Sequence, residues 1–229
     1  MSEGLKTIAV LGGSGDLGGG LAYRWAKAGY PVIIGSRTAD KAKEAAELLI
    51  EKLSNIGIDA TVSGLDNDSA AKQGQIVALT VPFSHQRNTL EQVKESLVGK
   101  ILIDVTVPLV PPKVGRVQLP SEGSAGQIAQ QLLGEDVDVV SAFQNIAAHH
   151  LNSDHQINCD VLVCGNKKAA RDEVIKLVEA AGMKGWHAGP IDNSAAVEAM
   201  TSVLITINKI HNIESAGFVI TGESKSADE

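Results

Sequence analysis

A glycine-rich stretch near the start of the chain constrains the fold more than any other feature. Residues 7–20 read TIAVLGGSGDLGGG, a short apolar run followed by a G-x-G-x-x-G pattern and then by a helical pattern. The run is typical of a strand buried on both faces. In the pattern, Gly13 permits a tight turn, Gly15 lets the backbone approach a pyrophosphate, and Gly18 lets the helix pack closely on its strand. This order of strand, turn and helix predicts a dinucleotide site, with a purely structural turn as the alternative.

The tip of the predicted second strand separates the two nicotinamide dinucleotides. An NAD site usually places Asp or Glu here, to bind the ribose 2′-hydroxyl, but residues 30–37 read YPVIIGSR. Ser36 offers a hydroxyl, and Arg37 and Lys41 offer cations suited to a 2′-phosphate. We therefore predict NADP(H). The alternative is that Ser36 caps the next helix and Arg37 is a solvated charge. Asp16, inside the glycine loop, is expected to point outward at the helix N-terminus, where a carboxylate is favoured.

Apolar runs alternate with helical patterns through the first 142 residues. The predicted strands cover 8–11, 30–37, 60–63, 75–81, 101–104 and 137–142, and the predicted helices cover 17–28, 39–53, 66–74, 84–97 and 124–133. Such alternation requires right-handed crossovers and a parallel sheet, in which ligands lie at the carboxyl ends of the strands. We predict an α/β fold with an N-terminal Rossmann-type doubly wound parallel sheet over 1–143. A smaller C-terminal α/β domain is expected over 144–221, and a frayed tail over 222–229.

The C-terminal part has its own pattern. Residues 157–164, 169–181 and 183–187 predict a small strand–helix–strand unit, and residues 194–212 predict a long helix. Apolar residues recur at helical spacing along that helix: Val197, Met200, Val203, Leu204, Ile207 and Ile210. A stripe of this kind is typical of a core or of a dimer interface.

Four prolines between residues 105 and 124 exclude a regular helix or a central strand there. This stretch is either a passive linker or a loop that frames the active cleft, with Lys113 and Arg116 as anion contacts.

Composition excludes several classes of partner. A formal net charge of −7 argues against nucleic acid or an anionic membrane. There is no apolar run of 18 residues and no signal-peptide pattern at the start, so we expect a cytoplasmic protein. Cys159 and Cys164 are too close in one strand-like segment for an unstrained disulfide, and buried thiols are expected.

Side chains that could carry out catalysis themselves are scarce. His149 and His150 are adjacent in a helix-like stretch, so their side chains should diverge by about 100° and not share a metal ion. No carboxylate–histidine spacing suits a metal site, and no nucleophile motif occurs. We predict no metal and no catalytic side chain. Hydride transfer between two cofactors needs few such groups, because its main requirement is proximity of the two rings.

Six segments together resemble one family. They are GGSGDLGGGLA, IIGSRTADKA, LTVPFSH, VVSAFQNIAA, VLVCGN and AGPIDNS, and they extend over residues 7–217. They resemble the F420-dependent NADP reductases. The first three are shared with wider NADP-binding relatives such as pyrroline-5-carboxylate reductase, whereas CGN with AGPIDNS is more specific.

The resemblance implies an activity and a set of site residues. Such enzymes move a hydride between nicotinamide C4 and deazaflavin C5, with a C-terminal domain folded over the acceptor, and they are commonly homodimers. The implied contacts to the NADP phosphates and ribose are Ser14, Gly15, Asp16, Leu17, Ser36, Arg37 and Lys41, beside Gly13 of the turn. The residues implied to line the nicotinamide pocket and the deazaflavin cleft are Phe83, Val107, Leu109 and Ala148.

One segment departs from the family pattern. Where archaeal members tend to read H-T-I-P-A, this chain has Gln144, Asn145 and Ile146 followed by two alanines. We expect these three residues to contact the acceptor, with the amides of Gln144 and Asn145 donating hydrogen bonds to ring carbonyls. The alternative is that both are structural amides at a strand end. The loss of histidine and proline leaves the identity of the acceptor open.

Three hypotheses for function remain. The first is an oxidoreductase that transfers a hydride between NADP(H) and coenzyme F420. The second is an NADPH-dependent reductase of a flavin, an imine or another small acceptor on the same scaffold. The third is a non-catalytic NADP(H)-sensing module.

Overall fold

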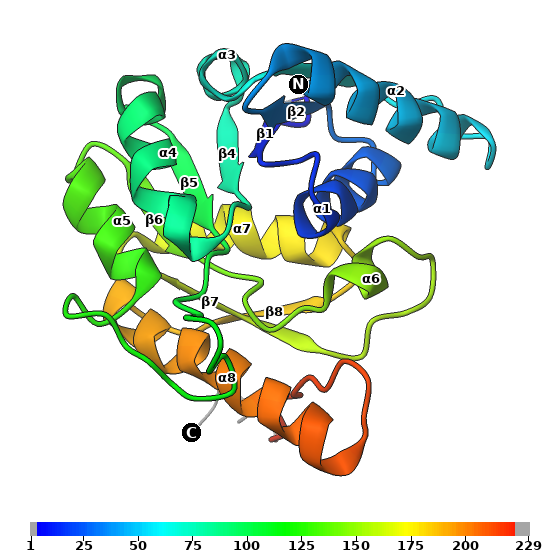
Figure 1. The fold of residues 1–229 in the computed structure, drawn as a ribbon. Coiled ribbons are helices and arrows are strands. Elements are labelled where there is room, and N and C mark those ends of the chain that lie inside the picture. The colour runs from blue at the N-terminus through cyan, green and yellow to red at the C-terminus, as the bar shows by residue number, and fades with distance from the viewer. Residues whose placement is uncertain (1–3, 223–229) are drawn as a thin grey trace, which may run out of the picture.

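The computed structural model describes residues 4–222, which form one sheet flanked by helices (Figure 1). The strands are β1 (Ile8–Leu11), β2 (Val32–Ser36), β3 (Val62–Asp66), β4 (Ile76–Leu79), β5 (Ile101–Asp104), β6 (Asp138–Ser141), β7 (Asp160–Gly165) and β8 (Lys184–His187). The helices are α1 (Asp16–Lys27), α2 (Ala39–Ser54), α3 (Asn67–Gln73), α4 (Phe83–Leu97), α5 (Ala125–Leu133), α6 (Ala148–Leu151), α7 (Lys168–Ala180) and α8 (Ser194–His211), with a 3₁₀ turn at Ile191–Asn193.

The sheet has the order β3-β2-β1-β4-β5-β6-β7-β8. All neighbours from β3 to β6 pair in parallel, as each crossover through a helix requires. The strand order reverses at β1, where the chain passes from the β2 side to the β4 side. Ligands in such sheets bind at that reversal, outside the carboxyl ends of the strands. The predicted α/β fold with a Rossmann-type parallel sheet is confirmed.

Strand β1 shows why the apolar runs lack alternation. Ile8 and Val10 belong to one core cluster, while Ala9 and Leu11 belong to a second, and all four are fully buried. The first cluster includes residues of α1, α2 and α7, and the second includes residues of α3, α4 and α5. Helices therefore cover both faces of the sheet, and successive strand residues face opposite layers.

The third strand differs from its prediction. It was expected over residues 60–63, but it runs over Val62–Asp66. Its register is set by β2, since Val32 pairs with Val62 and Ser36 with Asp66. Pairing with a neighbouring strand thus overrides the low strand propensity of a segment that reads VSGLD. The helix predicted over 66–74 starts at Asn67, because the Asp66 side chain accepts a hydrogen bond from the Ser69 N–H as its N-cap.

The predicted strand–helix–strand unit is β7-α7-β8, whose two strands pair in parallel. It continues the main sheet, because β7 pairs antiparallel with β6 through only two residue pairs. Trp25 of α1 joins the unit to the rest: it is fully buried, donates from Nε1 to the Leu177 carbonyl at 2.9 Å, and packs edge-to-face on Phe143.

The long helix α8 lies at the bottom of Figure 1, with the segment between β5 and α5 beside it. That segment is irregular, as its prolines predict, and two of its carbonyls accept hydrogen bonds from α8. Thr206 donates to the Gly115 carbonyl at 2.7 Å, and Ser202 donates to the Arg116 carbonyl at 3.3 Å.

Several smaller predictions can be compared with the structure. Cys159 and Cys164 are buried free thiols, as expected. No helix within residues 4–222 is long and apolar enough to cross a membrane, and the cytoplasmic location stays a prediction. The expected frayed tail over 222–229 lies outside the described residues except for Gly222.

Candidate functional site

The glycine loop connects β1 to α1, and its left-handed residue is Gly12. Gly12 has φ of +79°, whereas Gly13, for which the sequence predicted the tight turn, does not adopt a positive φ. The prediction for Gly18 is confirmed, because a Cβ there would lie 2.4 Å from Thr80 Oγ1 and 2.8 Å from the Gly12 carbonyl oxygen. Gly18 therefore allows α1 to approach the ends of β1 and β4 closely.

Helix α1 begins without a side-chain cap. Gly15 is its N-cap residue and has no side chain, whereas α3 and α5 are capped by Asp66 and Ser124. The N–H groups of the first turn of α1 are thus left for a ligand, and a helix N-terminus favours an anion. Ser14, Gly15 and Asp16 are all exposed, so the outward position expected for Asp16 is confirmed.

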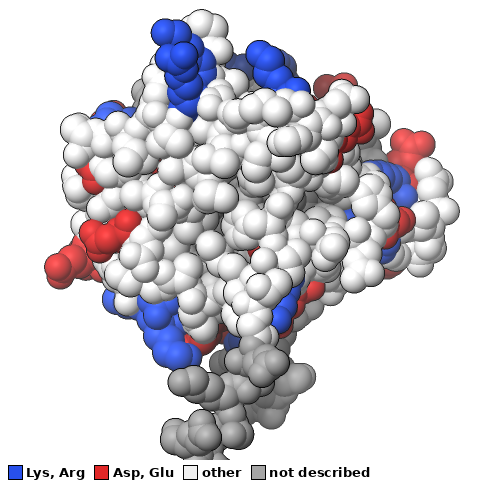
Figure 2. Space-filling model, turned by 90° about the horizontal axis from the view of Figure 1, so that it is seen from below, with Lys and Arg blue, Asp and Glu red and all other residues white. Residues whose placement is uncertain are grey.

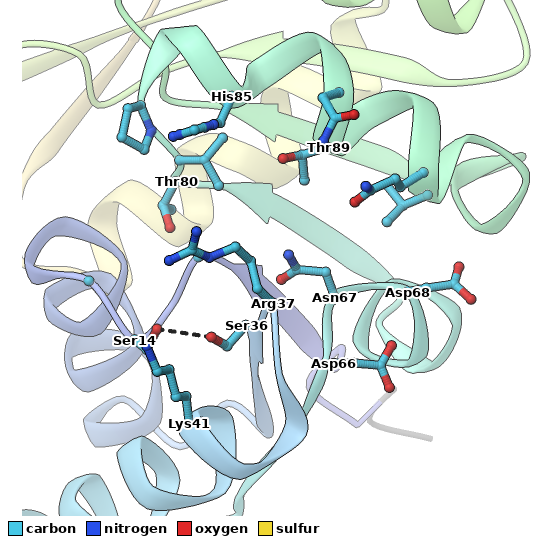
Figure 3. A pocket seen from close by; sticks show the side chains of 17 residues that line it. Ser14, Ser36, Arg37, Lys41, Asp66, Asn67, Asp68, Thr80, His85 and Thr89 are labelled. Carbon is cyan, nitrogen blue, oxygen red and sulfur yellow. Dashed lines mark hydrogen bonds between the residues drawn. The ribbon is translucent and has the colours of Figure 1, made fainter.

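A cavity of about 730 Å³ opens beside this helix start (Figure 3). Five of the predicted coenzyme residues line it: Ser14, Gly15, Ser36, Arg37 and Lys41. They come from the glycine loop, the end of β2 and the first turn of α2. The sequence-predicted site is therefore brought together at one end of a single cavity, at the carboxyl edge of the sheet.

The tip of β2 forms the cationic end of this cavity. Ser36 is buried, and its hydroxyl lies 3.2 Å from that of Ser14. Arg37 and Lys41 are exposed, and Figure 3 shows both side chains beside this pair of hydroxyls. Two cations and two hydroxyls in one place suit a phosphate monoester such as the 2′-phosphate of NADP(H). The donor set of the chain thus fits the predicted coenzyme.

The opposite wall of the cavity was missed by the sequence analysis. One face of α4 lines it, through His85, Asn88, Thr89, Gln92 and Val93. Their spacing places them on adjacent turns of one side of the helix. In the sequence this face reads as an ordinary solvated face, and only the position of α4 directly after β4 could have indicated a ligand wall. Amide and imidazole groups beside an apolar side chain suit the edge and face of an adenine ring.

Asn67 and Asp66 were missed as well. Both line the cavity from the junction of β3 and α3, opposite Arg37. Hydrogen bonds from the N–H and hydroxyl of Ser69 hold the pKa of Asp66 below its usual value. Its carboxylate is therefore committed to capping α3.

The remaining predicted phosphate contacts lie beside the cavity. Gly13 and Asp16 line a second hollow of about 280 Å³ between α1 and α2, next to Ser14. Leu17 lines neither hollow and packs against the core under α1.

Four predicted nicotinamide and acceptor residues lie outside both hollows: Phe83, Val107, Leu109 and Ala148. Each is partly buried, and they follow the carboxyl ends of β4, β5 and β6. They therefore share the sheet edge at which the coenzyme cavity opens, and their contacts with a ligand stay a prediction.

The prediction that Gln144 and Asn145 donate hydrogen bonds to ring carbonyls is wrong. Gln144 Nε2 donates to the Asp104 carbonyl at 2.9 Å and to Ser141 Oγ at 2.8 Å. Asn145 Nδ2 donates to Cys159 Sγ at 3.0 Å and to the Asp160 carbonyl at 2.8 Å. Both N–H bonds of each amide are used within the protein, as the structural alternative requires. Ile146 follows in the same turn and is buried.

Two buried carboxyl groups lie behind this turn. Burial raises the pKa of Asp104, whose side chain accepts hydrogen bonds from Thr106 and Gln86. Burial likewise raises the pKa of Glu198 to about 8. Glu198 extends from α8 to the N-terminus of α5, where it accepts hydrogen bonds from the N–H groups of Ala125 and Gly126 at 2.7 and 3.0 Å. It therefore joins α8 to the main sheet.

The histidines lie closer together than helical geometry predicts. The ring centroids of His149 and His150 are 4.3 Å apart, and His150 Nδ1 lies 2.7 Å from His155 Nε2. Helix α6 is a single turn, so its side chains are free to turn toward one another. Within residues 4–222, no group of three His, Cys, Asp or Glu side chains is arranged to hold a metal ion.

Comparisons with known proteins agree along almost the whole chain. Residues 7–108 match the family model described as NADP oxidoreductase, coenzyme F420-dependent. The F420-dependent NADP reductase of Methanocaldococcus jannaschii is 41% identical over 219 residues, which cover 93% of this chain and 97% of the relative. That of Methanothermobacter marburgensis is 39% identical over 220 residues, with the same coverage. A putative F420-dependent NADP reductase from Arthrobacter sp. FB24 has the same fold, with a TM-score of 0.77 and 24% identity over 96% of this chain and 100% of that one.

We predict that Arg37→Glu separates the two coenzymes. The new carboxylate repels a 2′-phosphate but not a 2′-hydroxyl, so NADPH affinity should fall by about a hundredfold or more and NADH affinity far less. Calorimetric titration of both coenzymes measures this. Lys43→Glu, on the same helix as Lys41 but outside the cavity lining, is the control. Equal losses for the two coenzymes would show that Arg37 does not contact the 2′-phosphate.

We predict a pH-dependent stability from Glu198. Because its folded-state pKa of about 8 lies above the ordinary value of 4.5, the folded state binds the proton more tightly. The contribution of this group to stability is full below pH 4.5 and is lost as pH rises through 8. Glu198→Gln should therefore flatten the fall in unfolding free energy between pH 5 and pH 8, measured by urea denaturation. A variant with the same slope as the wild type would contradict this account.

Proposed function

The chain belongs to the F420-dependent NADP reductase family, and we infer that it transfers a hydride between NADP(H) and coenzyme F420. The observation that carries this is the full-length similarity to reductases of that name, above 35% identity on both sides of the sheet. When NADPH reduces the deazaflavin, the hydride goes to C5 and a solvent proton goes to N1, which balances the reaction.

The N-terminal part of the chain, residues 1–143, is proposed to bind and orient the coenzyme. Ser36, Arg37 and Lys41 hold the 2′-phosphate, and the uncapped N–H groups of α1 hold the diphosphate. With these two groups fixed, the nicotinamide is directed past Thr80 to the ends of β4 and β5. The partly buried apolar side chains there, of which Val107 is one, exclude water from the ring that donates the hydride.

Residues 144–221 are proposed to supply the acceptor side. The turn that contains Gln144 follows β6 at the same sheet edge, and α8 packs against it because Thr201 donates a hydrogen bond to the Gln144 carbonyl at 3.0 Å. No side chain needs to act as acid or base in the transfer itself. The contribution of the protein is to hold the two reacting carbons in contact, about 3–3.5 Å apart.

We predict that the purified protein bleaches oxidised F420 with NADPH in a one-to-one ratio. The loss of deazaflavin absorbance and of NADPH absorbance measures this. Rapid NADPH oxidation by a flavin or an imine, with F420 left unchanged, would instead support the second hypothesis. Tight NADPH binding without turnover of any acceptor would support a sensing module.

The protein is also proposed to be a homodimer that uses the exposed side of α8. The apolar stripe of this helix is divided, because Val197 and Leu204 are buried whereas Met200, Val203 and Ile210 are exposed. Figure 2 shows this lower face of the molecule, whose centre carries few charged side chains. Further exposed apolar side chains belong to segments beside α8: Val110, Val117, Leu119, Val219 and Ile220. An apolar area of this kind is typical of a protein–protein interface.

We predict that Val203→Glu converts the dimer into a monomer, because it buries a charge in an apolar interface. Sedimentation equilibrium at micromolar concentration measures the mass. Val98→Glu, at an exposed apolar position after α4, should leave the dimer intact. A monomeric wild type would exclude the proposed dimer.

A further inference from the structure

The turn after β6 contains two buried oxygens that the fold leaves without donors. Within residues 4–222, three buried side-chain polar atoms have no hydrogen-bond partner in the protein. One is Asn67 Oδ1, in the wall of the coenzyme cavity, and the other two are Gln144 Oε1 and Asn145 Oδ1. The side chains of these two neighbours are only 6% and 7% exposed.

The orientation of each amide is fixed by its partners. If the Gln144 amide were turned over, its oxygen would face the Asp104 carbonyl oxygen at 2.9 Å. A turned Asn145 would place its oxygen 2.8 Å from the Asp160 carbonyl oxygen. Two acceptors at such distances repel, so the N–H groups must point into the protein and the oxygens must remain without a donor.

The backbone of the same turn is strained. Phe143, directly before Gln144, has φ of +72°, in the left-handed region that a bulky residue rarely adopts. Phe143 is held there by full burial against Trp25. Unpaired buried acceptors and a strained backbone both cost free energy, and such features gather at functional sites.

The place of the turn suits a ligand of the hydride-transfer site. The bond to Asp104 puts Gln144 beside the end of β5, which continues into the segment that contains Val107 and Leu109. Asn145 is bonded to the start of β7. The two oxygens therefore lie where the main sheet meets the C-terminal unit, at the edge where coenzyme and acceptor must meet.

We propose that Gln144 Oε1 and Asn145 Oδ1 accept hydrogen bonds from N–H groups on the ring of the hydride acceptor. The proposal rests on the proposed function, since the ring class it requires is a cyclic imide such as the pyrimidine-dione of a deazaflavin. That ring has an imide N3–H in both redox states and gains N1–H when the hydride and proton are added. The pair thus selects a ring by its donors, and it favours the reduced ring, which has two.

The first test is the binding of oxidised deazaflavin and of its N3-methyl derivative to the protein loaded with NADP⁺, a combination that cannot react. In calorimetric titrations the wild type should bind the N3-methyl ring at least about tenfold more weakly. Gln144→Met keeps the bulk of the side chain but cannot accept the bond. The ratio should therefore fall toward one in this variant, and also in Asn145→Ala. Gln130→Met, which removes an amide from α5, should keep the wild-type ratio.

The second test compares the two redox states with the coenzyme-free protein. The reduced ring should bind more tightly than the oxidised ring, and each of the two variants should reduce that difference. A crystal structure with reduced deazaflavin should place N1 and N3 within hydrogen-bond distance of the two oxygens.

Each other outcome overturns the proposal. Equal binding of N3–H and N3-methyl rings by the wild type, with F420 still reduced by NADPH, refutes it while the proposed function stands. The same holds if a buried water occupies both oxygens in the complex. Absence of both binding and turnover of F420 refutes the proposed function and this proposal with it. If Gln144→Met does not fold, the wild-type ratio and Asn145→Ala still decide.

Discussion

The close approach of α1 to the ends of β1 and β4 is the constraint on which the rest of the site depends. Any side chain at Gly18 would collide with Thr80 and with the backbone of Gly12. This contact places the first turn of α1 at the sheet edge, and the absence of a side-chain cap at Gly15 leaves its N–H groups for an anion. The cavity beside it then only needs the cations at the tip of β2 to distinguish a phosphorylated ribose from a plain one.

The two sides of the reaction centre differ in what they offer a ligand. The coenzyme side offers donors: backbone N–H groups, two hydroxyls and two cations, one of them Arg37. The turn after β6 offers oxygens, because Gln144 and Asn145 use their N–H groups to hold the turn between β5 and β7. A phosphate-rich coenzyme and an N–H-bearing ring would each meet the complementary kind of group. Each substrate is thus unsuited to the place of the other.

Much of the fold could be predicted from the sequence, because buried parallel strands are apolar throughout and helices between them keep a regular period. The β3 strand was misplaced because its residues are weak strand formers that follow the register of β2. At the site, the residues of the glycine loop and the β2 tip were predicted because their chemistry is local. The α4 face could not be, since a polar face beside a ligand and one beside water read alike. The roles of the Gln144 and Asn145 amides depend on carbonyls at Asp104 and Asp160, which only the fold brings near.

The seam between β6 and β7 has a consequence for how such proteins diversify. Two residue pairs of reversed direction ask little of the chain that follows, whereas each parallel neighbour before them demands a crossover of set handedness. The six-stranded portion can therefore keep its geometry while whatever is attached after Ser141 is exchanged, lengthened or rebuilt. Evolution can graft new acceptor chemistry at this joint without disturbing the nucleotide platform.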